Sequence, residues 1–151
     1  MPSISTDRLI HASPEAVFDV ASNVELWAEL DNPIIKVELL TPPPVGLGTR
    51  FRETRLMFKK EATEEMEFLE WERPTHYKLG AESHGSRYVT TFTLTSEGDS
   101  TRLTMHFDAT PLTFMAKVMS VMMKPMMKMM INMCGKDLEA IKAHVEGLEG
   151  K

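Results

Sequence analysis

Cysteine is almost absent from this chain. Its 151 residues include a single one, Cys134, which excludes an intramolecular disulfide and any metal site built on spaced cysteines. The five histidines are scattered, and none shows the spacing of two histidines around a glutamate that binds zinc. The sequence also lacks a glycine-rich phosphate loop, a serine elbow and a cysteine–histidine pairing. We therefore expect no metal and no cofactor.

The sequence lacks the patterns of a secretory signal and of a long apolar run as well. The N-terminal residues MPSISTDRLIHASPEAVFD contain no basic stretch followed by an apolar run, so they predict no secretory signal. Lysines, Pro125 and Asn132 interrupt the most apolar part of the chain, which excludes a membrane-spanning helix there. With 42% hydrophobic and 26% charged residues, the composition is typical of a globular protein. We expect a single domain over residues 1–151, located in the cytoplasm.

Acidic residues are missing from one segment, Ala109 to Lys136, which carries four lysines. The charge of this segment is +4, whereas the rest of the chain carries −9 and the whole chain −5. A chain that is acidic outside one segment lacks the broad basic footprint of nucleic-acid binding, so we expect no nucleic-acid partner. The basic segment leaves open a transient contact with a membrane surface or with an acidic partner. The sequence also leaves open whether the protein forms a homodimer.

The predicted elements follow the order strand, two short helices, six strands and a long helical segment. Residues 3–11 alternate as a first strand. Ser13-Pro14-Glu15 gives an N-cap, a proline at the first helical position and an acid in the first turn, which predicts a helix over residues 14–21. A second short helix is predicted over residues 23–30. Short β-like runs separated by turns then occupy residues 34–40, 49–58, 62–71, 75–83, 87–95 and 101–109.

Consecutive strands joined by hairpin-length loops predict an antiparallel sheet that bends strongly. A bent sheet has one concave face, which must be covered. The helical segment 112–148 is the one large element left to cover it. We therefore expect this segment to lie against the inside of the sheet.

Nine of the thirteen methionines lie in the first part of that helical segment, MAKVMSVMMKPMMKMMINM (residues 115–133). Steps of four and three positions put six of them on one stripe: Met115, Met119, Met122, Met126, Met129 and Met133. A second stripe contains Met123, Met127, Met130 and Cys134 and continues through Leu138, Ile141, Val145 and Leu148. Pro125 predicts a kink or break of the helix near Lys124.

Four interpretations of the methionine stretch stay open. Apolar stripes on helices usually pack in a core. Methionine is flexible and polarizable, whereas a uniquely packed core uses leucine and isoleucine, which favours the wall of an adaptable ligand cavity. The lysine-only charge is compatible with a membrane or partner surface. Thioethers also suit copper(I), but methionines on two stripes are poorly focused for a metal.

Strand alternation selects the side chains that would face the helix. In two neighbouring strands, apolar residues at every second position indicate the inward side. With three methionines of the helix, they form a predicted ligand-binding wall: Tyr88, Thr90, Phe92, Leu94, Met105, Phe107, Met126, Met130 and Met133. Tyr88 and Thr90 would be its polar contacts.

The phase of the run over residues 49–58 stays open. If Phe51 and Met57 face inward, Glu53 and Arg55 do so too. Buried charges need partners, so an inward Glu53 and Arg55 would form a cross-strand pair or anchor a polar ligand group. In the opposite phase both charges lie in water.

Four stretches resemble the START/Bet v 1-like helix-grip superfamily (SRPBCC), and within it the bacterial polyketide cyclase/dehydrase-like proteins. They are SPEAVFDVASNVELWAELD, VGLGTRF, FLEWERPTHYKL and LEAIKAHVEG. The resemblance implies an α+β fold, in which a curved antiparallel seven-stranded sheet wraps around a long C-terminal helix and two short helices follow the first strand. It also implies an apolar cavity between sheet and helix. It fixes no activity, because members of the superfamily have many functions.

We expect the chain to bind a hydrophobic small molecule in that cavity, such as a lipid, an acyl chain or a polyketide-like aromatic. An alternative is a polyketide cyclase/dehydratase-type enzyme that positions a reactive chain and exchanges protons through Tyr88, Glu53 or Arg55. A second alternative is peripheral association with a membrane or partner through the basic methionine-rich helix. The sequence assigns no catalytic residue.

Overall fold

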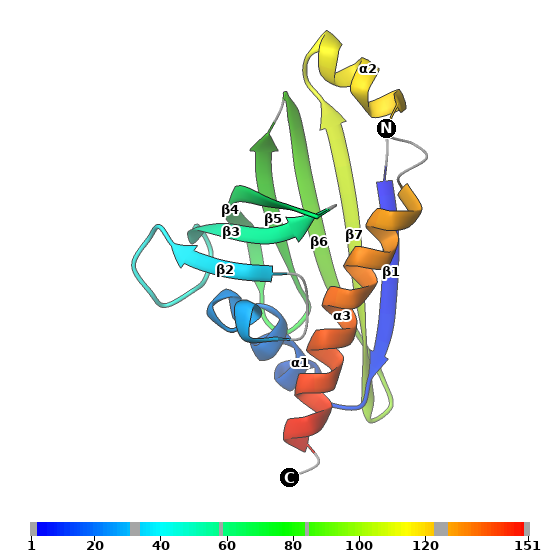
Figure 1. Cartoon of the computed structure of the whole chain (residues 1–151). Helices are drawn as coiled ribbons and strands as arrows, with labels where there is room; N and C mark the ends of the chain where they lie inside the picture. The colour runs from blue at the N-terminus through cyan, green and yellow to red at the C-terminus, as the bar shows by residue number, and fades with distance from the viewer. Residues whose placement is uncertain (1–2, 31–33, 58, 84, 123–126, 150–151) are drawn as a thin grey trace.

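The computed structural model describes residues 3–30, 34–57, 59–83, 85–122 and 127–149 of the chain. They form a seven-stranded antiparallel sheet in the order β1-β7-β6-β5-β4-β3-β2 (Figure 1). The strands are β1 (Ser3–Ile10), β2 (Ile34–Leu39), β3 (Arg50–Met57), β4 (Lys60–Glu72), β5 (His76–Ser83), β6 (Ser86–Glu97) and β7 (Ser100–Pro111). The predicted order of elements is confirmed. Because each strand from β2 to β6 pairs with the next one along the chain, hairpin connections alone build most of the sheet.

Two short helices follow β1, as the sequence predicts. The α1 helix (Pro14–Ala21) begins at the Ser13 N-cap, whose side-chain oxygen accepts a hydrogen bond from the Ala16 backbone N–H at 3.2 Å. The second is a 3-10 helix, η1 (Val24–Glu29), which contacts β2. Together they close one end of the inner side of the sheet.

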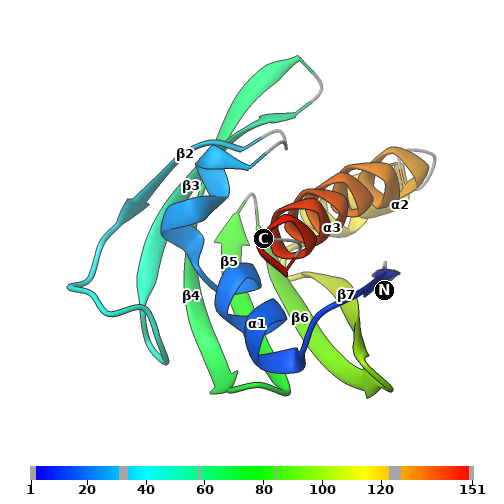
Figure 2. The same cartoon turned by 90° about the horizontal axis from the view of Figure 1, so that it is seen from below.

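The predicted C-terminal helical segment forms two helices, α2 (Phe114–Met122) and α3 (Met127–Glu149). The predicted break at Lys124 and Pro125 lies outside the described residues. The α3 helix contacts β1, β7 and α1 on the inner side of the sheet, and Figure 2 shows the sheet curving around it. The expected helix-grip architecture is therefore present.

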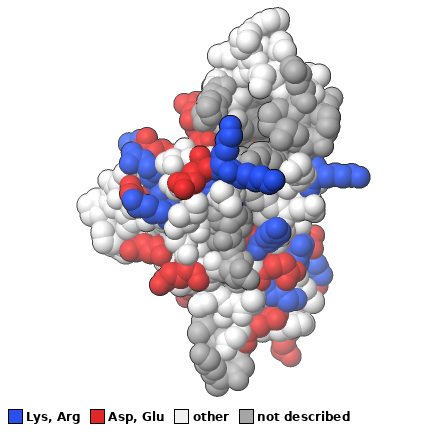
Figure 3. Space-filling view, in the orientation of Figure 1, with Lys and Arg blue, Asp and Glu red and all other residues white. Residues whose placement is uncertain are grey.

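The prediction that the six-methionine stripe faces the sheet is wrong in part. Met115 and Met119 on α2 are 69% and 51% exposed, and Met129 on α3 is 53% exposed. Their stripe would be continuous only on one uninterrupted helix. The α2 helix contacts β7 and extends away from the body of the molecule. In the view of Figure 3, the described atoms at that tip are white and belong to uncharged residues.

The second stripe sets the inward side of α3. Cys134, Leu138, Ile141 and Val145 are all buried on it. Met130 and Met133 are half-buried, while Met126 lies outside the described residues. The helix therefore turns a mixed aliphatic stripe, rather than a methionine stripe, to the core.

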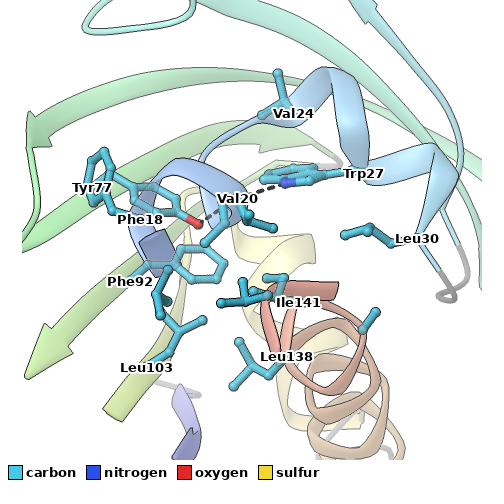
Figure 4. Packing of buried hydrophobic residues seen from close by; sticks show 14 of the residues in the cluster. Phe18, Val20, Val24, Trp27, Leu30, Tyr77, Phe92, Leu103, Leu138 and Ile141 are labelled. Carbon is cyan, nitrogen blue, oxygen red and sulfur yellow. Dashed lines mark hydrogen bonds between the residues drawn. The ribbon is translucent and has the colours of Figure 1, made fainter. Parts of the chain in front are cut away.

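Aromatic rings fill the core near α1 and η1. Phe18 makes edge contacts with Trp71 and Tyr77, and Tyr77 stacks on Phe92 with ring centroids 4.6 Å apart. The Tyr77 hydroxyl and the Trp27 indole N–H both donate to the Ala21 carbonyl oxygen, at 3.0 and 2.9 Å. Figure 4 shows the rings of Phe18, Trp27, Tyr77 and Phe92 together with Leu138 and Ile141 of α3. This end of the sheet–helix interface is a closed, satisfied core.

Candidate functional site

Burial changes along the inner face of β6 and β7. Phe92 pairs with Met105 and Leu94 with Leu103, and at this end Leu94 and Leu103 are 6% and 0% exposed. Towards α2 the inward residues of the same two strands become half-buried: Tyr88, Thr90, Phe107 and Ala109. Solvent therefore reaches side chains on the concave face at the α2 end, although the other end is filled.

Tyr88 and Phe107 form a stacked pair at this accessible end. Their ring centroids are 5.7 Å apart and their planes meet at 20°. In Figure 1, α3 begins beside β1, the strand that pairs with β7. Its first two turns carry Met130 and Met133, both half-buried. A half-buried aromatic pair and flexible methionines both suit contact with an apolar molecule.

The predicted wall residues fall into two groups. Tyr88, Thr90, Met105, Phe107, Met130 and Met133 are half-buried. Phe92 and Leu94 instead belong to the closed core, where Phe92 stacks on Tyr77. The sequence indicates which side chains of each strand face inward. It does not indicate the point along each strand at which the closed core ends.

The burial of its side chains shows which side of β3 faces inward. Phe51 and Glu53 are 0% and 3% exposed, whereas Leu56 is 49% exposed. Glu53 therefore faces inward, and Glu64 of β4 is its direct cross-strand partner on the same face.

An ion-pair triad occupies this inner face. The Arg55 Nε donates to Glu53 Oε1 at 2.6 Å, and its Nη2 donates to Asp137 Oδ2 at 3.1 Å. The side chains of Arg55, Glu53 and Asp137 are only 15%, 3% and 11% exposed. Burial by itself lowers the pKa of Arg55, but the neighbouring charges of Glu53 and Asp137 raise it, so the guanidinium stays charged.

Among the described residues, only one of the two carboxyl oxygens of Asp137 has a hydrogen-bond partner. Its Oδ2 accepts from Arg55, while its Oδ1 is buried and has no hydrogen-bond partner among the described residues. Burial raises the pKa of Asp137 to about 6, the charge of Glu53 adds to that rise, and the charge of Arg55 opposes it. A buried carboxylate with a free oxygen is costly for the fold, which marks it as a candidate binding group.

Sequence reasoning missed Asp137, although a signal was present. It lies three residues after Cys134 and four before Ile141, so it is an acid on the apolar stripe of α3. Burial raises the pKa of the Cys134 thiol to about 11, with a smaller contribution from the charge of Asp137. The triad and the Tyr88–Phe107 pair lie in different parts of the sheet, on β3 and on β6–β7. The triad also includes Asp137 of α3.

Neither a metal site nor a spanning helix is found in the described part of the chain. No group of three or more histidine, cysteine, aspartate or glutamate residues there is placed to hold a metal ion. No described helix is long and apolar enough to cross a membrane.

Comparison with known families identifies the chain. The family model described as polyketide cyclase / dehydrase and lipid transport matches residues 1–146. The chain belongs to this family. The predicted helix-grip superfamily is thereby confirmed. No curated protein sequence matches the chain.

Solved structures of other members of the fold are similar over nearly the whole chain. The protein TTHA0849 from Thermus thermophilus is 20% identical with a TM-score of 0.80, covering 97% of this chain and 99% of that one. The di-domain ARO/CYC StfQ from the steffimycin biosynthetic pathway is 10% identical with a TM-score of 0.78, covering 99% of this chain and 52% of that one. A norcoclaurine synthase from Thalictrum is 15% identical with a TM-score of 0.74, covering 98% and 96%. At such identities the likeness shows the fold alone.

Proposed function

We propose that this member of the polyketide cyclase / dehydrase and lipid transport family binds a hydrophobic small molecule, such as a lipid, an acyl chain or a polyketide-like aromatic. The ligand lies between the α2 end of β6–β7 and the first turns of α3. One observation carries the proposal. On two paired strands the inward residues are fully packed at one end, whereas Tyr88 and Phe107 are half-exposed at the other.

The chemistry of the half-buried residues supports this function. Met130 and Met133 have several rotatable bonds and a polarizable sulfur, so they adapt to ligands of different shapes. Ligand sites are mostly apolar with a few polar groups that fix orientation, and Tyr88 and Thr90 supply such groups at the same end.

Binding is tested with a neutral hydrophobic fluorophore, Nile red, and by native mass spectrometry of the purified protein. We expect saturable binding, and we expect Phe107→Ala to weaken it about tenfold or more, because burial of one aromatic ring contributes about 1.5–3 kcal/mol. Thr104→Ala is the matched control, because Thr104 lies on the outward side of the same strand. Folded protein that binds no hydrophobic probe, or equal affinity in both variants, would reject the proposal.

A cyclase- or dehydratase-type activity would use the same inner face. It needs an inward group that exchanges protons near neutral pH. Arg55 binds both Glu53 and Asp137, but Asp137 has a pKa of about 6 and one oxygen without a partner among the described residues, so it is the carboxyl that fits this role. Since such an enzyme must also bind a hydrophobic substrate, binding is the function that the geometry supports best.

A second candidate function is association with an anionic membrane surface through α2. Six large apolar side chains at its start and along it are 40% to 77% exposed: Leu112, Phe114, Met115, Val118, Met119 and Val121. Exposed apolar clusters of this kind mark interaction sites. Lys117 is exposed among them, and the sequence from Ala109 to Lys136 contains no acid. Apolar side chains with lysine-only charge complement a bilayer that carries negative headgroups.

Co-sedimentation with vesicles tests this surface. We expect binding to phosphatidylcholine vesicles that contain phosphatidylglycerol, less binding without it, and loss of binding in the Phe114→Ser, Met119→Ser double variant. Leu47→Ser is the control, because Leu47 is 71% exposed in the β2–β3 loop. A stable dimer in sedimentation velocity that the double variant abolishes, without vesicle binding, would assign the surface to a second copy instead.

A further inference from the structure

The inner face opposite α3 is acidic. Glu53 of β3 and Glu64 of β4 are directly opposite each other in the β3–β4 register, so both side chains lie on the same face. Asp137 approaches this face from α3, and Arg55 lies between Glu53 and Asp137. Two buried carboxyl groups, those of Glu53 and Asp137, thus share one guanidinium, whose Nε and Nη2 are each bonded to one of them.

Asp137 has one acceptor oxygen to which a ligand could donate. The residue is 8% exposed, its Oδ2 is held by Arg55, and its Oδ1 has no partner among the described residues. Leaving a buried acceptor unpaired destabilises the fold, and more so when the group is charged. A donor from a ligand would remove this cost.

The apolar part of the proposed site leads to this oxygen. Met130 and Met133 precede Asp137 by seven and four residues, and spacings of four and seven put side chains on one side of a helix. At 1.5 Å per residue, Met130 is about 10 Å from Asp137 along the axis of α3. A molecule that contacts the methionines with its apolar body can therefore bring one end to Asp137.

We propose that the ligand's polar end is a hydrogen-bond donor, a hydroxyl or an ammonium group, that binds Asp137 Oδ1, and that the site disfavours ligands ending in a carboxylate. This inference rests on the proposed function and names the class of ligand. A donor satisfies the free oxygen, and an ammonium group also offsets the excess of carboxylates. A carboxylate would instead add a further negative charge beside Glu53 and Asp137 in a buried site, where like charges repel strongly.

The test compares three ligands with the same chain and different polar ends. Dodecanol, dodecylammonium and dodecanoate compete with Nile red for the purified protein, below their micellar concentrations. We expect dodecanol and dodecylammonium to displace the probe at concentrations at least tenfold lower than dodecanoate. Of these two ligands, the one that displaces the probe at the lower concentration shows whether the preferred donor is a hydroxyl or an ammonium group.

Two variants test whether Asp137 causes the preference for a ligand with a hydrogen-bond donor. Asp137→Asn keeps an acceptor oxygen but loses the charge, so the preference for dodecylammonium over dodecanoate falls about tenfold or more. Asp99→Asn makes the same chemical change in the exposed β6–β7 turn and leaves the preference unchanged. If Asp137→Asn does not fold, the wild-type comparison decides alone.

The outcomes separate the two proposals. If all three ligands displace Nile red equally, hydrophobic binding stands and the preference for a donor is rejected. An unchanged preference in folded Asp137→Asn also rejects it. If Nile red does not bind at all, the proposed function fails and this inference fails with it.

Discussion

Arg55 on β3 and Asp137 on α3 are 82 positions apart in the chain and meet at 3.1 Å between Nη2 and Oδ2. Other described polar contacts hold α3 to the opposite edge of the sheet, through the Arg8–Glu139 ion pair and the bond from the Lys142 amine to the Leu9 carbonyl. The helix is thus fixed along β1 by several bonds and tied to β3 through Arg55. Because the candidate binding groups lie between these two sides, the Arg55–Asp137 pair is positioned to set how closely β3 approaches the helix.

Removal of the guanidinium should destabilise the protein strongly. Arg55→Ala leaves the carboxylates of Glu53 and Asp137 buried without their partner, and breaking a buried ion pair in this way costs about 3–5 kcal/mol. Urea unfolding at pH 7 measures the change in the free energy of unfolding. Arg52→Ala is the matched control on the same strand, because Arg52 pairs with Glu38 at the surface, where ion pairs contribute little. Similar losses in both variants would show that the Arg55 triad does not support the fold.

Asp137 should make stability depend on pH between about 4 and 6. Its pKa is raised from 3.8 to about 6 in the folded state, so in this window the folded protein holds a proton that the unfolded chain has lost. The contribution of Asp137 to stability therefore falls as pH rises. The difference of about two pKa units corresponds to about 3 kcal/mol at most, and this contribution is fully lost above pH 6.

Urea unfolding of the wild type and Asp137→Asn over a pH series measures this effect. We expect the asparagine variant to gain stability relative to the wild type as pH rises from 4 to 6. Asp99→Asn should follow the wild type throughout, because Asp99 is exposed in a turn. A difference between wild type and Asp137→Asn that stays constant over this range would contradict the raised pKa.

The element order and the inward phases were readable from the sequence because they depend on local patterns. The Ser13-Pro14-Glu15 signal located α1, and alternate apolar residues gave the inward side of β6 and β7. The path of α2 was not readable, because it depends on which neighbours the helix meets in the folded chain. Asp137 was missed for a similar reason. An acid on an apolar stripe is noticeable, but its partner Arg55 is brought to it only by the bend of the sheet.

The two stripes of α3 should differ in their contribution to stability. Leu138 is fully buried against the core, whereas Met129 is 53% exposed. Leu138→Ala should cost about 2–5 kcal/mol, because it removes buried methyl groups and leaves a cavity. Met129→Ala should change the free energy of unfolding by about 0.5 kcal/mol or less, as is usual for surface positions. Denaturant unfolding of both variants measures this, and a large loss in Met129→Ala would show that the methionine stripe is covered in solution.

Methionine itself should determine the range of ligands rather than the stability. Met130→Leu combined with Met133→Leu preserves side-chain volume, so the free energy of unfolding should change by less than about 1.5 kcal/mol per position. Leucine has fewer rotatable bonds and a fixed branched shape, so the double variant should bind a narrower set of ligands. Nile red competition with linear, branched and aromatic alcohols of similar size compares the two proteins. We expect wild type to bind all three classes within about tenfold of one another, and the leucine variant to spread their affinities more widely. An equal spread in both proteins would show that these methionines serve packing alone.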